Sequence, residues 1–180
     1  LTLGDGQDNS LTGTLDNDVI LGGKGDDSLT GSAGDDQLIG GDGDDTYIIG
    51  SGSGKDTIID SMGVNTISFI DGIGFSDVSS GLMRSGDDLI LSIASTGNQV
   101  KVNNFFAVAN TINSLDFEDG SQITANQLYG AFGVSAPTDT DVIEDALSHV
   151  MTGTTSNDII TGTSANEYLS GLAGDDILSG

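Results

Sequence analysis

The chain has 180 residues and a formal net charge of −24, from 28 acidic and only 4 basic side chains. This charge argues against nucleic acid and anionic membrane surfaces as partners, and no apolar run is long enough for direct membrane insertion. The sequence has no cysteine, so neither disulfides nor thiolate metal sites hold the fold together.

Aspartate and glycine recur in phase near the N-terminus. Nine-residue units begin at Gly13, Gly22, Gly31 and Gly40, each with Asp at its sixth place and an apolar residue at its eighth. Asp8 lies ten residues before Asp18, which we interpret as a register slip of one residue, and Asp56 follows a two-residue insertion. The sixth-place residues are then Asp8, Asp18, Asp27, Asp36, Asp45 and Asp56. Residues 1–60 thus form one repeat segment.

Each unit predicts a Gly-rich turn followed by a strand of about three residues, whose eighth-place side chain points inward. Two units form one coil of a parallel β-roll. The apolar ladder inside such a roll is too thin to offset the cost of ordering the backbone, about 1–2 kcal/mol per residue. Rows of Asp carboxylates on neighbouring turns also repel one another. A bound cation removes both difficulties.

Calcium is the cation that these loops fit best, because it takes about six to eight oxygen ligands from carboxylates and backbone carbonyls. Magnesium demands stricter octahedral geometry, and zinc and copper are disfavoured without Cys and with a single His, His149. Besides the six aspartates, the candidate metal-site residues are the loop glycines Gly4, Gly6, Gly22, Gly25, Gly31, Gly34, Gly40 and Gly43.

Residues 61–132 predict a β-rich capping segment, since the open end of a β-roll must be covered. We expect strands at 65–70, 89–94 and 99–106, another beginning at Leu115, and a short helix capped by Thr124. The acidic pairs Asp87-Asp88 and Glu118-Asp119 lie beside glycines, so we interpret them as hairpin turns rather than catalytic carboxylates.

The remainder of the chain leads into a second series of repeats. Residues 133–152 predict a linker that contains Pro137, followed by a helix of about ten residues. The capping-box pair Asp141 and Glu144 indicates where this helix begins. Residues 153–180 start a second β-roll. Its sixth-place residues, all candidate metal ligands, are Asp158, Glu167 and Asp176.

These units match the pattern G-G-x-G-x-D-x-U-x, and the chain resembles the RTX, or haemolysin-type calcium-binding, family of secreted bacterial proteins. The resemblance also covers the segment that begins at Asp44 and runs through the cap. It implies an all-β fold, a calcium-bound parallel β-roll, with calcium between loops of successive coils. The implied ligand pairs are Asp8 with Asp27, Asp18 with Asp36, Asp27 with Asp45, Asp36 with Asp56, and Asp158 with Asp176, while Glu167 would pair outside this sequence.

The resemblance implies a non-catalytic module that is exported by type I secretion, folds on calcium outside the cell, and serves as a spacer in an adhesin, toxin or cell-surface array. Its expected partners are calcium ions, neighbouring modules of the same chain and copies assembled side by side. Two alternatives stay open. One is an accessory module of a secreted hydrolase, lyase or epimerase, and the other is an adhesive module whose cap binds sugar or peptide.

Overall fold

A computed structural model describes residues 1–60, 62–107 and 112–135 and four strands of the C-terminal repeats. Contacts divide the chain into two units, Leu1–Ala136 and Pro137–Gly180. Within the residues that the structure describes, no helix has both the length and the apolar character needed to cross a membrane.

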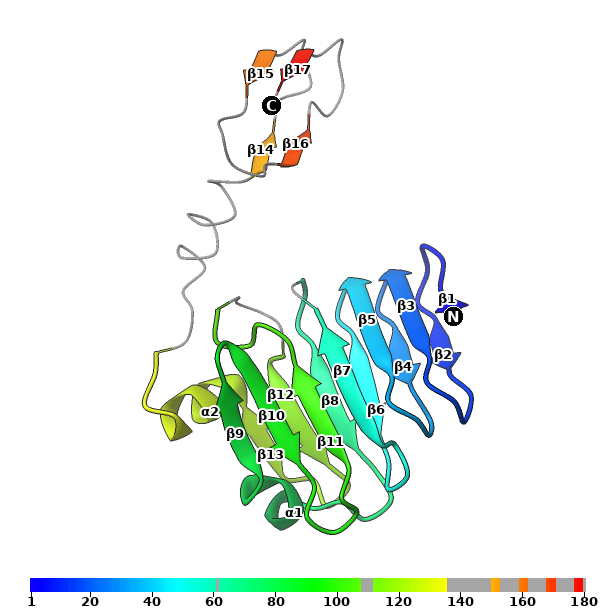
Figure 1. The fold of residues 1–180 in the computed structure, drawn as a ribbon, viewed down its shortest axis with the longest axis vertical. Coiled ribbons are helices and arrows are strands. Elements are labelled where there is room, and N and C mark those ends of the chain that lie inside the picture. The colour runs from blue at the N-terminus through cyan, green and yellow to red at the C-terminus, as the bar shows by residue number, and fades with distance from the viewer. Residues whose placement is uncertain are drawn as a thin grey trace. The chain divides into compact units, whose positions relative to one another are not determined.

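The first unit begins with two parallel sheets that face each other, and consecutive strands alternate between them (Figure 1). One sheet holds β1 (Thr2–Leu3), β3 (Val19–Lys24), β5 (Gln37–Asp42) and β7 (Lys55–Ile59). The other holds β2 (Ser10–Thr12), β4 (Ser28–Thr30), β6 (Thr46–Ile49) and β8 (Thr66–Phe69). Leu11 pairs with Leu29 and Ile20 with Leu38. Each coil therefore contains two repeat units, as predicted.

The eighth place of each unit faces the interior, as the alternation predicted. Ile20, Leu29, Leu38 and Tyr47 are fully buried, while the residues on either side of them in the strands are partly exposed. Ile58 and Ile67 continue the same ladder into the next coil. This single ladder is the whole apolar core of the early coils.

The predicted register slip at Asp8 is wrong. Ser10 pairs with Ser28 and Leu11 with Leu29, so the first unit, 4–12, is in phase with the units that follow. Asn9, not Asp8, therefore occupies the sixth place. A one-residue slip would turn Leu11 to the outside of the roll, and strand pairing keeps it inside. The predicted insertion is confirmed, because Gln37 pairs with Thr57 across 20 residues instead of 18.

The segment after the repeats extends both sheets. β11 (Gln99–Val102) pairs in parallel with β7, and β10 (Asp88–Ser92) and β9 (Leu82–Ser85) continue that sheet in antiparallel fashion. β12 (Ser114–Phe117) pairs in parallel with β8, and β13 (Gln122–Thr124) follows it. Two helices, α1 (Phe75–Ser79) and α2 (Ala125–Ala131), complete the segment.

Most elements of this segment were predicted, with some differences. The strand expected over 99–106 stops at Val102, because Asn104 adopts a positive φ of 55°. Thr124 caps α2 as predicted, accepting a hydrogen bond from the Gln127 backbone. α1, β9 and β13 were not predicted. Phe105 is fully buried and stacks on Tyr129, so the aromatic residues here extend the hydrophobic core at the end of the roll.

The second unit is described only through its strands. β14 (Val150–Thr152) pairs in parallel with β16 (Tyr168–Ser170), and β15 (Ile159–Thr161) pairs with β17 (Ile177–Ser179). The partners are again two repeat units apart. The helix predicted from Asp141 and the candidate ligands Asp158, Glu167 and Asp176 lie outside the described residues.

Candidate metal sites of the repeat loops

The sixth-place aspartates of successive coils contact one another. Asp18, Asp27 and Asp36 each donate a backbone N–H to Oδ1 of the sixth-place Asp one coil further on, at 2.8, 2.8 and 3.1 Å. The acceptors are Asp36, Asp45 and Asp56. Three of the implied pairs are thus brought together. In the fourth, Asn9 replaces Asp8 as the neighbour of Asp27, at 2.7 Å.

The second oxygen of these carboxylates has no protein partner. Oδ2 of Asp27, Asp36, Asp45 and Asp56 is buried and receives no hydrogen bond from the residues that the structure describes. The four residues are only 1–2% exposed. A buried acceptor without a partner costs about 1–3 kcal/mol, and more when it is charged. Four such oxygens in one small roll favour a bound cation that would compensate them.

The first-place glycines leave room for a cation beside these oxygens. A Cβ placed on Gly22, Gly31 or Gly40 would lie only 2.3, 2.2 or 2.1 Å from Oδ2 of the Asp in its own unit. At Gly22 it would also lie 2.6 Å from the Gly40 carbonyl oxygen, and at Gly4 it would lie 2.0 Å from the Gly22 carbonyl oxygen. Any side chain here would fill a space lined by carboxylate and carbonyl oxygens, the donor set that calcium prefers.

The fourth-place glycines are required by the backbone. Gly25, Gly34 and Gly43 have φ values of 102°, 126° and 136°, and each packs against the backbone of the preceding coil. Only glycine adopts such angles without strain. Gly6 is different, because a Cβ added there would meet nothing within 4 Å. The structure therefore gives no reason for glycine at Gly6.

A second row of aspartates, at the fifth place, points the other way along the roll. Asp8 accepts the backbone N–H of Asp26 at 2.9 Å, and Asp26 accepts that of Asp44 at 2.8 Å. Asp44 in turn accepts the Val64 N–H at 2.7 Å. Asp8 belongs to this row, whose side chains are exposed and hydrogen-bonded, rather than to the row of buried sixth-place carboxylates.

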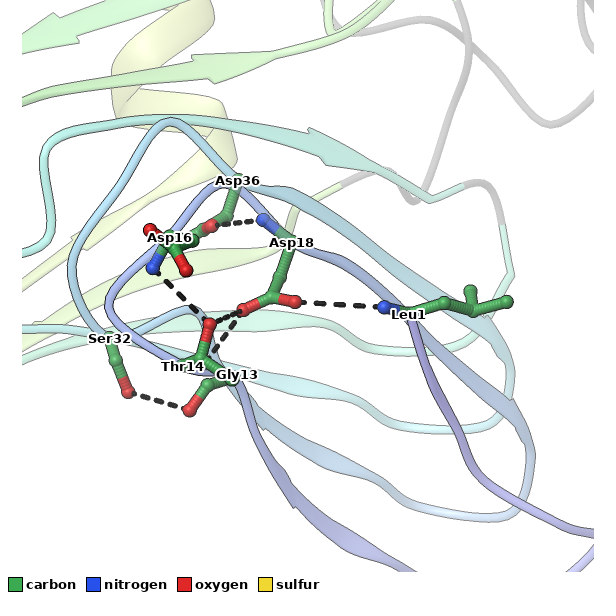
Figure 2. A network of polar contacts seen from close by, with 7 residues as sticks. All are labelled: Leu1, Gly13, Thr14, Asp16, Asp18, Ser32 and Asp36. Atoms are coloured by element: carbon green, nitrogen blue, oxygen red, sulfur yellow. Dashed lines mark hydrogen bonds and ion pairs between the residues drawn. The ribbon is translucent and has the colours of Figure 1, made fainter.

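Asp18 departs from the other sixth-place aspartates (Figure 2). The backbone N–H and the hydroxyl of Thr14 donate to its Oδ2, at 2.6 and 2.8 Å. These bonds lower the pKa of the Asp18 carboxyl below its usual value. Thr14 stands at the second place, where the next coil of the same row has Ser32 with a φ of 76°. The protein itself therefore satisfies the Asp18 carboxylate.

Three of the buried sixth-place aspartates differ from Asp18, because their pKa values are raised and not lowered. Burial raises the pKa of Asp36 and of Asp45, and neighbouring carboxylates add to this effect. For Asp56, burial raises the pKa to about 7. A nearby cation would reverse these shifts, because it favours the ionised carboxylate.

The described residues contain no cluster of three or more His, Cys, Asp or Glu side chains. Each site must therefore be completed by backbone carbonyls and water, which suits a hard cation and not zinc. When bound, calcium would supply the positive charge that joins the loops of neighbouring coils. Asp27, Asp36, Asp45 and Asp56 are the side chains best placed to hold it, and ligation by Asp8, Asp18 and the C-terminal acidic residues stays a prediction.

The fold and these loops define a calcium-binding parallel β-roll. The family described as RTX calcium-binding nonapeptide repeat (4 copies) matches residues 3–38, 12–47, 22–58 and 150–180. The haemolysin-type calcium binding protein related domain matches residues 88–127. The chain belongs to the RTX, haemolysin-type calcium-binding family, and calcium is the metal of its repeats.

The solved structures that are similar to this chain include a subunit of an epimerase and a lipase. The AlgE6R3 subunit of the Azotobacter vinelandii mannuronan C5-epimerase is 26% identical, with a TM-score of 0.32 over 61% of this chain and 79% of that one. The extracellular lipase LipA from Serratia marcescens is 23% identical, with a TM-score of 0.29 over 95% of this chain and 24% of the lipase. The chain thus spans about a quarter of the lipase. A comparison with curated proteins gives no match.

Proposed function

We propose that this chain is a non-catalytic structural module that folds on calcium outside the cell and acts as a spacer in a larger secreted protein. The observation that carries the proposal is the set of buried Oδ2 atoms on Asp27, Asp36, Asp45 and Asp56 that no protein group satisfies. Such carboxylates oppose folding until a cation binds, so the metal and the fold are thermodynamically coupled.

The calcium concentration would then decide whether the chain is unfolded, as in the cytosol, or folded, as outside the cell. A ligand that binds only the folded state stabilises it by RT ln(1 + [Ca²⁺]/Kd) for each site. At low cytosolic calcium this contribution vanishes, and a chain of net charge −24 repels itself. RTX repeat proteins are generally exported by type I systems, and the higher calcium outside the cell would fold the roll after export.

The acidic pairs of the cap support a structural rather than a catalytic role. Asp88 lies 3.8 Å from the ammonium of Lys101, and Glu118 accepts the backbone N–H of Gly72 at 3.1 Å. Asp87 lies 3.4 Å from the guanidinium of Arg84 within the hairpin. These carboxylates hold turns and neighbouring strands, as the sequence interpretation expected.

The edge strands favour neighbouring repeats as partners. β1 and β2 are the last strands of their sheets, and Leu3, the final residue of β1, is 62% exposed. A repeat coil from another part of the protein, or from a second copy, would continue both sheets with the same register.

Circular dichroism of the chain tests the proposal directly. In excess EGTA we expect the spectrum of a largely unfolded chain, and added calcium should restore β-structure in one cooperative transition. A spectrum that is the same in EGTA and in calcium would contradict the proposal.

A further inference from the structure

Asp60 stands where the other coils have glycine. Ile39 pairs with Ile59 between β5 and β7, so Asp60 lies beside Gly40, the first-place residue of the preceding coil. It lies outside the nonapeptide pattern of sixth-place aspartates, and the repeat gives no reason for a carboxylate there. Asp60 is nevertheless only 8% exposed.

Three side-chain oxygens converge beside Gly40. A Cβ built on Gly40 would lie 2.1 Å from Asp45 Oδ2, 2.4 Å from the Tyr47 hydroxyl and 2.5 Å from Asp60 Oδ2. Asp45 is 1% exposed and Tyr47 is fully buried. At Gly22, one coil earlier in the repeat pattern, the three atoms nearest to the same position belong to the Asp27 carboxylate and the Gly40 carbonyl.

The hydrogen bonds in this cluster orient Asp60 and leave one oxygen of Asp45, Oδ2, without a donor. The Gly40 N–H donates to the Tyr47 hydroxyl at 2.9 Å, and the Tyr47 hydroxyl donates to Asp60 Oδ2. The Met62 N–H donates to Asp60 Oδ1 at 3.2 Å. Asp45 Oδ2, buried beside the same space, receives no hydrogen bond from the described residues. Two carboxylates in so small a buried space need positive charge between them.

We propose that Asp45 and Asp60 form a two-carboxylate calcium site beside Gly40, with Tyr47 holding Asp60 in place, and that this site is the tightest of the N-terminal roll. The proposal rests on the proposed function, because it assigns one site within a roll that calcium folds. Asp60 adds a carboxylate that stands outside the sixth-place row, and calcium affinity rises with the number of charged ligands.

Terbium, which replaces calcium and emits when a nearby tyrosine absorbs light, reports on this site. The chain has no tryptophan, and its three tyrosines are Tyr47, Tyr129 and Tyr168. We expect tyrosine-excited emission to reach most of its final value with the first equivalent of terbium added to the full chain. Tyr47→Phe should remove most of that emission, whereas Tyr129→Phe and Tyr168→Phe should retain it.

Asp60→Asn tests the second carboxylate. We expect the calcium concentration that displaces half of this terbium signal to rise at least about tenfold. Asp42→Asn is the matched control, because it removes the same charge from an exposed side chain paired with Lys24. Equal midpoints for the two variants would overturn the proposal, and would indicate a proton shared between the carboxylates instead of a cation.

The wild-type titration decides the proposal even if Asp60→Asn fails to fold at saturating calcium. Emission that grows evenly over all equivalents of terbium, or that persists in Tyr47→Phe, would overturn it. The proposed function fails separately, when calcium leaves the circular dichroism of the wild-type chain unchanged. Calcium-dependent folding together with equal midpoints for Asp60→Asn and Asp42→Asn overturns only the two-carboxylate site.

Discussion

Asp36 links three coils through its main chain and its side chain. Its Oδ1 accepts the N–H of Asp18, its own N–H donates to Asp56 Oδ1, and its Oδ2 is left for a cation. A change at this residue therefore affects two neighbouring loops at once.

Asp36→Asn keeps an oxygen that can accept the Asp18 N–H but removes the charge that a cation requires. We expect the calcium midpoint of folding, followed by circular dichroism, to rise at least about fivefold. Asp87→Asn is the control, because Asp87 lies exposed in a hairpin of the cap. Equal midpoints for the two variants would mean that Asp36 holds no calcium.

The raised pKa of Asp56 predicts a pH dependence. The folded pKa of about 7 lies above the ordinary value of 3.8, so in the calcium-free chain this residue favours folding at low pH. That contribution is fully present below the unfolded pKa and is lost as the pH rises through about 7. Calcium binding must release the proton, so calcium affinity should increase with pH up to about 7.

Calcium titrations at several pH values between about 5 and 8 measure this competition. Below the pKa of Asp56, the midpoint should fall by up to about tenfold per unit of increasing pH. The variant Asp56→Asn should have a higher midpoint and a weaker pH dependence. A wild-type midpoint that does not change with pH would contradict the release of a proton from Asp56 on calcium binding.

At the scale of the element, the loop and strand of each unit could be predicted from the sequence, because the turn-forming residues and the buried apolar residues recur with the same nine-residue period. Glycine and aspartate mark the turns, and the eighth-place residues Ile20, Leu29, Leu38 and Tyr47 mark the interior. The slip at Asp8 was wrong because aspartate identity was given more weight than the phase of Leu11. The elements α1, β9 and β13 are too short to show the hydrophobic periodicity of a helix or of a strand, so they could not be predicted.

The candidate site was predicted only as far as the repeat extends. The sixth-place row was predicted from spacing, but two spatial facts were not. Thr14 satisfies Asp18, and Asp60 reaches Gly40 only because the insertion before Asp56 keeps β5 and β7 in register. A carboxylate at a glycine place is the sequence signal that would have identified Asp60.

The backbone of the loops gives a prediction at the same scale. Gly34 has a φ of 126°, and a Cβ added there would lie 2.9 Å from the Asp16 carbonyl oxygen. We expect Gly34→Ala to destabilise the calcium-bound roll by about 1–3 kcal/mol, measured by thermal unfolding at saturating calcium. Gly52→Ala is the matched control, because its Cβ would meet nothing within 4 Å. An equal loss in both variants would contradict the role of the left-handed turn.

At the scale of the whole molecule, two separate effects oppose folding without calcium. One is the general repulsion of a chain whose net charge is −24, which any salt screens. The other is the buried carboxylate oxygens of Asp27, Asp36, Asp45 and Asp56, which a cation inside the loops compensates when the carboxylates are ionised. The two effects respond to different ions, so they can be separated.

Sodium chloride at about 1 M reduces the screening length to about 3 Å and should make the calcium-free chain more compact in small-angle X-ray scattering. It should not produce the β-type circular dichroism spectrum, because screening supplies no ligand to the buried Oδ2 atoms. Magnesium at the calcium midpoint concentration should behave like sodium, since it keeps its water and demands octahedral geometry. If salt or magnesium alone restored the β spectrum, repulsion and not coordination would be what keeps the chain unfolded.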